Sequence, residues 1–110
     1  MSAFDGFFSD VVGGAKDLAR TSLDGFVDQA EGDSKAFILT NKTELEKWGK
    51  QLANREITRD QFEFLVMGLK DLTEMHALTE AGVAEASVQR FRDKLINLVI
   101  NAAFKNFIPI

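Results

Sequence analysis

The residue with the widest chemical range in this sequence is its single histidine, His76. Helical metal sites commonly pair such a histidine with an acid three residues earlier on the same helix face. Here that position holds Thr73, the nearest acid is Glu74 on another face, and the chain has no cysteine. One histidine with Glu80 a turn later does not complete a zinc or iron site. We therefore expect a structural or solvent-exposed histidine, with neither a metal nor a cofactor.

Nucleophilic and acid–base catalysis find equally little support in the sequence. A serine or threonine nucleophile needs a positioned base, and the chain has one histidine and no Gly-x-Ser-x-Gly turn. Acid pairs such as Asp60 and Glu63 flank predicted helix starts, where carboxylates interact favourably with the helix dipole. Gly13-Gly14 lacks the continuation of a phosphate-binding loop, so we interpret it as a point of flexibility or close packing. The sequence predicts no catalytic residue and a protein that is not an enzyme.

Charge is unevenly distributed along the chain. Residues 1–34 carry seven acids and two bases, a net charge of −5, whereas residues 35–110 carry ten acids and eleven bases, a net charge of +1. An acidic first third disfavours binding of that segment to nucleic acid or to an anionic membrane. No apolar run approaches the roughly 20 residues of a membrane span, and no secretory signal opens the chain. We therefore expect a cytoplasmic protein that crosses no membrane.

The spacing of apolar residues predicts helices, because no segment alternates with a period of two. In residues 3–30 apolar side chains recur every three or four residues, which predicts one amphipathic helix. Four glycines interrupt it, each at a cost of about 1 kcal/mol relative to alanine. Its apolar face must therefore be buried against its own chain or a neighbour. Residues 31–41 break the period, and Gly32, Asp33 and Ser34 predict a loop there.

Two capping boxes predict a helical hairpin after that loop. In each box a small polar side chain accepts a hydrogen bond from the third helical N–H, and the side chain of that third residue reaches back. Asn41 opens the box of a helix over residues 42–55. Thr58 opens the box of a helix over residues 59–80, with Gln61 as the residue that reaches back.

A last helix is predicted over residues 85–107. Leu72 and Val88 are 16 residues apart, so on one straight helix they would point about 160° away from each other. A break near Gly82, acting as a helix C-cap, resolves this difference between the helices over 59–80 and 85–107. The alternative is a continuous helix with two differently used faces.

These elements together predict an all-α fold, a small bundle of about four helices. We expect residues 1–34 to form an acidic amphipathic helix or arm, and residues 35–110 to form the hairpin and C-terminal helix of a single domain. Helices of these lengths make a thin core. The arm and the C-terminal tail therefore carry more apolar surface than one small monomer readily covers, which indicates an interaction site.

Residues 44–72, ELEKWGKQLANREITRDQFEFLVMGLKDL, resemble the short two-helix bacterial module known as SHOCT. That module has an apolar-spaced helix, a glycine, and then Ile-Thr-x-x-Glu-Phe at the start of a second helix. Ile57, Thr58 and Phe62 match this pattern, whereas Arg55 stands where glycine is usual and a glutamine replaces the glutamate. The resemblance covers roughly a quarter of the chain and implies self-association or another interaction, without catalysis.

The hairpin is also comparable to a helix-turn-helix nucleic-acid module, because residues 35–59 carry six bases and three acids, a net charge of +3. The helix that would enter the groove opens with residues 59–63, RDQFE, whose acids would repel phosphate. Nucleic acid is therefore a disfavoured partner.

We expect a non-catalytic helical protein that associates with itself as a homo-oligomer, burying the apolar faces of both terminal segments across subunits. Another protein is a second possible partner. The alternatives are a peripheral protein whose Phe-rich first helix lies on a membrane or other apolar surface, and a helix-turn-helix module. The candidate interaction residues are Phe4, Phe7, Phe8, Val11, Leu18, Phe26, Phe64, Phe104, Phe107 and Ile110. Among them, Phe64 faces away from its helix's apolar stripe and is the test residue for a partner surface. The number of subunits stays open, as does packing of residues 3–30 within the chain or across subunits.

Overall fold

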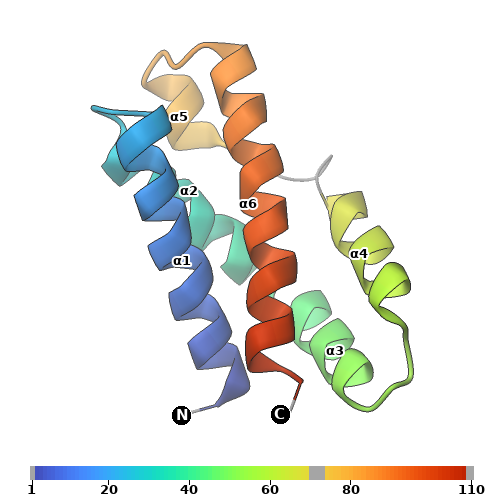
Figure 1. Cartoon of the computed structure of the whole chain (residues 1–110). Coiled ribbons are helices and arrows are strands. Elements are labelled where there is room, and N and C mark those ends of the chain that lie inside the picture. Colours follow the sequence, from blue (N-terminus) through green and yellow to red (C-terminus); the bar gives the residue numbers. More distant parts are fainter. Residues whose placement is uncertain (1, 70–73, 109–110) are drawn as a thin grey trace.

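Six helices account for most of residues 2–69 and 74–108, which are the residues that the computed structural model describes (Figure 1). Over these residues the protein is all α, as the sequence predicts, and contains no strand. There are two more helices than the expected four or so, because two predicted helices are each divided. The helices are α1 (Ala3–Ser22), α2 (Val27–Thr40), α3 (Lys42–Ala53), α4 (Arg59–Gly68), α5 (His76–Glu80) and α6 (Glu85–Asn106).

The N-terminal helix is shorter than the spacing of its apolar residues predicts. The chain turns between α1 and α2 at Gly25, whose φ of +90° lies in the left-handed region that glycine adopts without strain. α2 then occupies the segment that the sequence assigns to a loop. The predictions of one helix over residues 3–30 and of a loop over residues 31–41 are therefore wrong. The expected boundary between an arm over residues 1–34 and a domain over residues 35–110 falls inside α2.

A buried serine conceals the helical period of α2 in the sequence. Ala30, Ser34, Phe37 and Ile38 are all buried, at positions i, i+4, i+7 and i+8 of one helix face. Ser34 is tolerated inside because its hydroxyl donates to the carbonyl oxygen of Ala30 at 2.7 Å. The face is therefore continuous in space, although a pattern of apolar residues alone does not reveal it.

Asp33 caps helix α5 from a distant part of the sequence. Its two carboxylate oxygens accept hydrogen bonds from the backbone N–H groups of Ala77 at 3.0 Å and Leu78 at 2.9 Å. The residue before α5, Met75, makes no side-chain cap of its own. A helix of five residues is too short to be stable alone. We infer that the carboxylate of Asp33 and the fully buried side chain of Leu78 hold α5 in place.

One of the two predicted capping boxes is confirmed and the other is wrong. The Thr58 hydroxyl accepts from the backbone N–H of Gln61 at 3.1 Å, and the side-chain oxygen Oε1 of Gln61 accepts from the backbone N–H of Thr58 at 2.8 Å. The side chain of Asn41 makes no hydrogen bond to the start of α3. It donates instead to the carbonyl oxygen of Phe37 at 2.9 Å. Asn41 is the only residue between α2 and α3, and the carbonyl oxygen of Phe37 accepts from both its backbone N–H and its side-chain amide.

The helix predicted over residues 59–80 is divided, and α4 and α5 occupy its two ends. Beyond α5, Gly82 has a φ of +86°, and the N–H groups of Gly82 and the next residue close the helix with the paired hydrogen bonds of a Schellman motif. The predicted break at this glycine is therefore confirmed, and α6 is a separate helix close to the predicted 85–107. The prediction compared the directions of Leu72 and Val88, and Leu72 lies outside the described residues.

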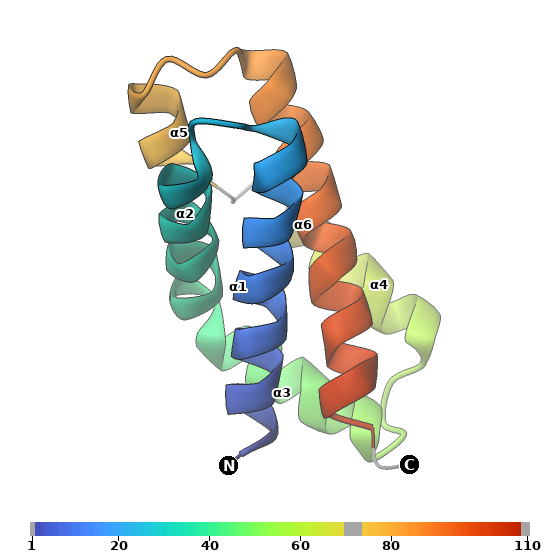
Figure 2. The ribbon, with the colours of Figure 1, turned by 60° about the vertical axis from the view of Figure 1, so that its left-hand side comes forward.

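α1 lies between α2 and α6, and it runs antiparallel to both (Figure 2). α4 packs along another side of α6, and α5 packs on α2 and on the first turns of α6 (Figures 1 and 2). α3 crosses the end of the bundle at which the two chain termini lie (Figure 2). α6 is thus the central helix, in contact with α1, α4 and α5. In the described part of the chain, no helix is both long and apolar enough to cross a bilayer.

α1 and α6 approach closely at a glycine of α1. A Cβ added at Gly14 would come within 2.8 Å of the Leu98 side chain of α6. Gly14 is therefore a point of close helix packing, whereas nothing lies within 4 Å of a Cβ added at Gly13.

A polar contact borders the packing of α1 on α6. The Asn106 amide of α6 donates to the Asp10 carboxylate of α1 at 2.8 Å, and the Lys105 ammonium lies 3.4 Å from the same carboxylate. The hydrogen bond from Asn106, with a smaller contribution from the charge of Lys105, lowers the pKa of Asp10 below its ordinary value.

Aromatic side chains gather where α1, α3 and the end of α6 meet. The ring of Phe107 lies 5.3 Å from the ring of Phe7, measured between centroids. The same ring covers Gly49 of α3, where an added Cβ would lie 2.8 Å from it. The absence of a side chain at Gly49 thus makes room for the C-terminal ring between two helices.

We expect Gly49→Ala to lower the free energy of unfolding by about 1–3 kcal/mol, the usual cost of overfilling a packed core. Gly13→Ala is the matched control, because its added methyl group meets open space. The control should stabilise the protein by about 0.5–1 kcal/mol through helix propensity. Urea denaturation measures both changes. Equal stability of Gly49→Ala and the natural protein would contradict the packing of Phe107 on α3.

We expect Asp33→Ala to lower the free energy of unfolding by about 1–2 kcal/mol, because two N–H groups of α5 lose their acceptor. Amide hydrogen exchange should become faster at Ala77 and Leu78 in particular. Asp24→Ala, which removes an exposed acid from the turn before α2, serves as the control and should leave these two amides unchanged. Equal protection of both amides in Asp33→Ala and the natural protein would show that the cap contributes nothing.

Candidate functional site

The histidine lies beside Glu74 rather than Glu80. Nε2 of His76 is 2.5 Å from a carboxylate oxygen of Glu74, and both side chains are exposed. Two residues that are two positions apart in a helix lie on different faces, but Glu74 precedes the first residue of α5 and is not bound by that spacing. Among residues 2–69 and 74–108, no three histidine or acidic side chains are grouped as a metal site would require.

Most of the candidate interaction residues lie inside the fold. Phe4, Phe7 and Val11 are at most 8% exposed, and they form part of the hydrophobic core. Ile110 lies outside the described residues. Five further candidates are half-buried and packed against that core: Phe8, Leu18, Phe26, Phe104 and Phe107.

The apolar stripe of the N-terminal segment is therefore buried within its own chain. The expectation that this stripe packs across subunits is corrected by the position of α1 between α2 and α6. Five of the aromatic candidates lie in two groups of ring contacts. Phe4, Phe7, Phe8 and Phe107 form one group at the terminal end of the bundle, and Phe104 forms an edge-to-face pair with Phe62 at 6.0 Å.

Phe64 differs from the other described candidates, because its side chain points from α4 into solvent and is 79% exposed. Met67, three residues later, is 47% exposed, and a Cβ added at Gly68 would meet open space. Ile57 and Leu65 border a shallow hollow of about 420 Å³ beside the Phe64 ring. We call these five residues the α4 face. The outward position of Phe64 follows the prediction from helical spacing, whereas Met67 and Gly68 were not predicted, although they follow Phe64 by one turn.

A charged residue beside the α4 face is engaged with its own chain. Nε of Arg59 lies 3.1 Å from a carboxylate oxygen of Glu63, and the guanidinium group lies 4.8 Å from the centre of the Phe104 ring. An exposed ion pair of this kind contributes at most about 1 kcal/mol, and the contact with the ring adds a cation–π attraction. Arg59 is therefore held against α6.

The turn that leads from α3 towards α4 contains a strained residue. Arg55 has a φ of +61°, a left-handed conformation that costs a non-glycine residue roughly 1 kcal/mol or more. It occupies the position after the helix cap at which glycine is usual, and its N–H donates to the carbonyl oxygen of Leu52 at 3.2 Å. The sequence predicts that the helix ends near Arg55 and does not reveal this conformation.

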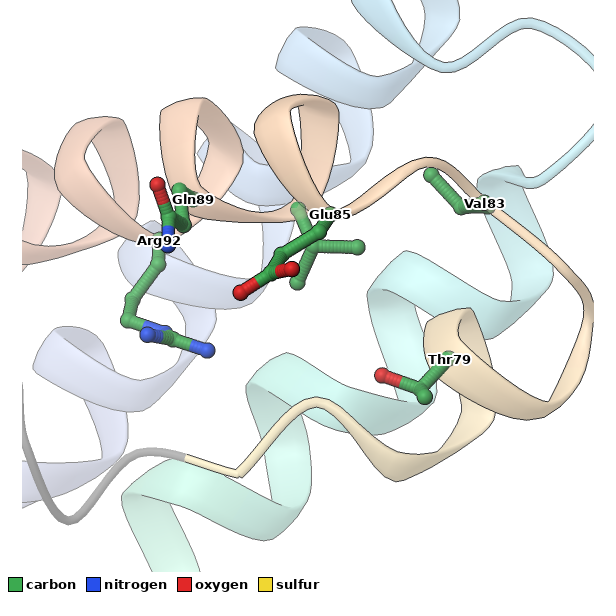
Figure 3. A pocket seen from close by; sticks show the side chains of 6 residues that line it. Thr79, Val83, Glu85, Gln89 and Arg92 are labelled. Atoms are coloured by element: carbon green, nitrogen blue, oxygen red, sulfur yellow. The ribbon is translucent and has the colours of Figure 1, made fainter.

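A pocket of about 300 Å³ lies between α5 and the first turns of α6 (Figure 3). Glu85, Gln89 and Arg92 line it from one face of α6, at positions i, i+4 and i+7. The side chains of Thr79, Glu85 and Arg92 point into the same space (Figure 3). The complete lining is Thr79, Val83, Glu85, Val88, Gln89 and Arg92. Sequence reasoning missed this group, because polar residues at helical spacing are typical of an ordinary solvent-facing surface.

Arg92 carries a buried donor without a partner. Its Nε atom is inaccessible to solvent and makes no hydrogen bond within the part of the chain that the structure describes. A buried donor left unpaired costs about 1–3 kcal/mol, and most buried polar groups in folded proteins have a partner. No ion pair joins Arg92 to Glu85 across the same described residues, although both side chains face the pocket.

Comparison with protein-family models, curated proteins and solved structures finds no match for this chain. Function must therefore be inferred from the geometry, which offers an exposed apolar helix face on α4 and a polar pocket between α5 and α6.

We expect Arg55→Gly to raise the free energy of unfolding by about 0.5–1 kcal/mol, because glycine adopts a left-handed φ without a Cβ clash. Asn54→Gly is the matched control. Asn54 has a right-handed φ of −86°, so its replacement should stabilise nothing and cost a few tenths of a kcal/mol in chain entropy. Thermal and urea unfolding measure both variants, and a less stable Arg55→Gly would contradict the observed turn.

Proposed function

We propose that this protein is a non-catalytic helical interaction protein that associates with a second copy of itself through the α4 face. The observation that carries the proposal is the exposure of Phe64, because every other phenylalanine in the described residues is buried or half-buried. Aromatic side chains are enriched among the residues that contribute most of the binding energy at protein interfaces.

The α4 face has a shape that suits a two-fold symmetric contact. Gly68 follows Phe64 by four residues, so a large ring and a bare stretch of backbone lie on the same side of the helix. In an antiparallel pair of α4 helices, each Phe64 ring would rest on Gly68 of the partner subunit. Such a contact is self-complementary, since each copy supplies both the ring and the place that receives it.

The length of α4 limits the strength of this association. A helix of ten residues is about 15 Å long. Stable complexes bury about 800 Å² on each partner, which one short helix with its flanking residues does not supply. We therefore expect a weak dimer whose population depends on protein concentration.

The other functions considered from the sequence lose support. The membrane-surface alternative depended on an exposed Phe-rich helix, and Phe4 and Phe7 are buried. The nucleic-acid alternative depended on the six bases of residues 35–59. Three of them, Lys35, Lys42 and Arg59, lie in ion pairs with glutamates of the same helices. The left-handed Arg55 stands where the two-helix module that residues 44–72 resemble usually has glycine, which supports a hairpin with an interaction role.

Sedimentation equilibrium on the full chain tests the proposal. Between about 10 μM and 1 mM, a range suited to a weak complex, the apparent mass should rise from 12.2 kDa towards twice that value. Phe64→Ser and Gly68→Gln should each raise the dissociation constant of the dimer by about tenfold or more. The first removes the ring, and the second fills the space at Gly68 that receives the ring. Leu39→Ser is the matched control, since it removes an equally apolar, 58% exposed side chain from α2.

A constant mass of 12.2 kDa over this range would overturn the proposal. So would a dimer that Leu39→Ser weakens as much as Phe64→Ser does. Circular dichroism of each variant separates loss of association from loss of folding, and surface changes of this kind should leave the helical signal intact.

A further inference from the structure

The two methionines of the described residues differ in their access to solvent. Met67 of α4 is 47% exposed, whereas Met75, at the start of α5, is 3% exposed and belongs to the hydrophobic core. The chain has no cysteine whose thiol would react first. Within the described part of the chain, Met67 is therefore the sulfur-containing side chain that a dissolved oxidant reaches most readily.

We propose that Met67 is a site of reversible oxidation by hydrogen peroxide, and that its sulfoxide weakens the association of α4 faces. The sulfur atom attacks one peroxide oxygen, an S–O bond forms and the O–O bond breaks. The thioether is thereby oxidised to the sulfoxide and the peroxide is reduced to water. A dithiol acting through a methionine sulfoxide reductase reverses the step, releasing the oxygen as water and becoming a disulfide. The effect on association rests on the proposed function.

The position of Met67 connects its oxidation state to the α4 face. It follows Phe64 by three residues, so the two side chains lie on neighbouring positions of the helix surface. The reduced side chain is apolar and flexible, which suits packing against another apolar face. The sulfoxide is polar, and burying it between two copies without a hydrogen bond costs free energy. A two-fold contact would contain this group twice.

The free chain can accommodate the sulfoxide. Met67 borders a groove of about 410 Å³ between α4 and α6, where the exposed Asn97 and Asn101 of α6 also lie. Their amide groups can donate hydrogen bonds, and a sulfoxide oxygen can accept them. A sulfoxide at Met75 would instead place a polar group in the core. We therefore expect oxidation at Met67 to change a surface and leave the fold intact.

Oxidation and association oppose each other in this scheme. A contact through the α4 face covers Met67, so the sulfur atom reacts in the free chain, which predominates at low concentration in a weak dimer. Coupling between two events is reciprocal. The contact should therefore protect Met67 from peroxide, just as the sulfoxide disfavours the contact.

Peptide mass spectrometry of the full chain after treatment with peroxide tests the site itself. Each added oxygen raises the mass of a peptide by about 16 Da. At about 10 μM protein, Met67 should be oxidised at least about tenfold faster than Met75, because burial withholds the second sulfur from solvent. At about 1 mM protein and the same fixed excess of peroxide, the reaction at Met67 should be slower. Phe64→Ser should remove this dependence on protein concentration.

Sedimentation equilibrium tests the effect of the sulfoxide on association. Oxidation should raise the dissociation constant of the dimer by about fivefold, and treatment with methionine sulfoxide reductase and dithiothreitol should restore it. Peroxide should leave the association of Met67→Leu unchanged, because that variant has no sulfur at this position. Met75→Leu is the matched control, a swap of similar volume that should keep the response. Circular dichroism reports whether each chain is folded.

Three results would count against these expectations, and they are distinguishable. Equal rates of oxidation at Met67 and Met75 would overturn the assignment of the site. An unchanged dimer after oxidation at Met67 would overturn the link to association and leave the contact between α4 faces standing. A monomer at every concentration before oxidation would overturn the proposed function, and with it that link.

Discussion

The packing of α1 against α6 is the contact on which the rest of the structure depends. Gly14 carries no side chain, so the two helices come close enough for Leu98 of α6 to cover the bare backbone of α1. This contact joins the two ends of the chain, and it places α6 at the centre with α4 and α5 on its other sides. It also turns glycines that weaken an isolated helix into points of close approach.

The same contact leaves the chain with a small apolar surface. A small domain of about four helices would have difficulty covering two apolar terminal segments, and here the segments cover each other. Phe107 packs on Phe7 and over Gly49, so the C-terminal ring is enclosed by α1 and α3. The α4 face remains exposed, because α4 packs on α6 with Phe62 and Val66 and points Phe64 outward. Two of the three large apolar side chains that are exposed in the described residues, Phe64 and Met67, lie together on this face, which is the physical basis for proposing a contact between copies.

Polar groups in the interior divide into those that hold the fold and one that does not. Asp33 and Ser34 of α2 are buried, and each has hydrogen-bond partners, the first at α5 and the second within its own helix. They stabilise the structure, since a buried polar group costs free energy only when it is left unpaired. Arg92 differs because its buried Nε–H contributes nothing to the fold within the described residues.

Local spacing and capping in the sequence by themselves determined the helical class, the Thr58–Gln61 box, the break at Gly82, the extent of α6 and the outward position of Phe64. Each depends on residues within one or two turns of each other, for which helical geometry is sufficient. Only the tertiary structure placed Asp33 and Ser34 on the buried side of a helix, because the carboxylate of Asp33 finds its partners at α5. It also decided that the N-terminal stripe is buried within the chain and that Gly49 receives a ring. These features arise between segments far apart in the sequence, where no local pattern specifies which faces will meet.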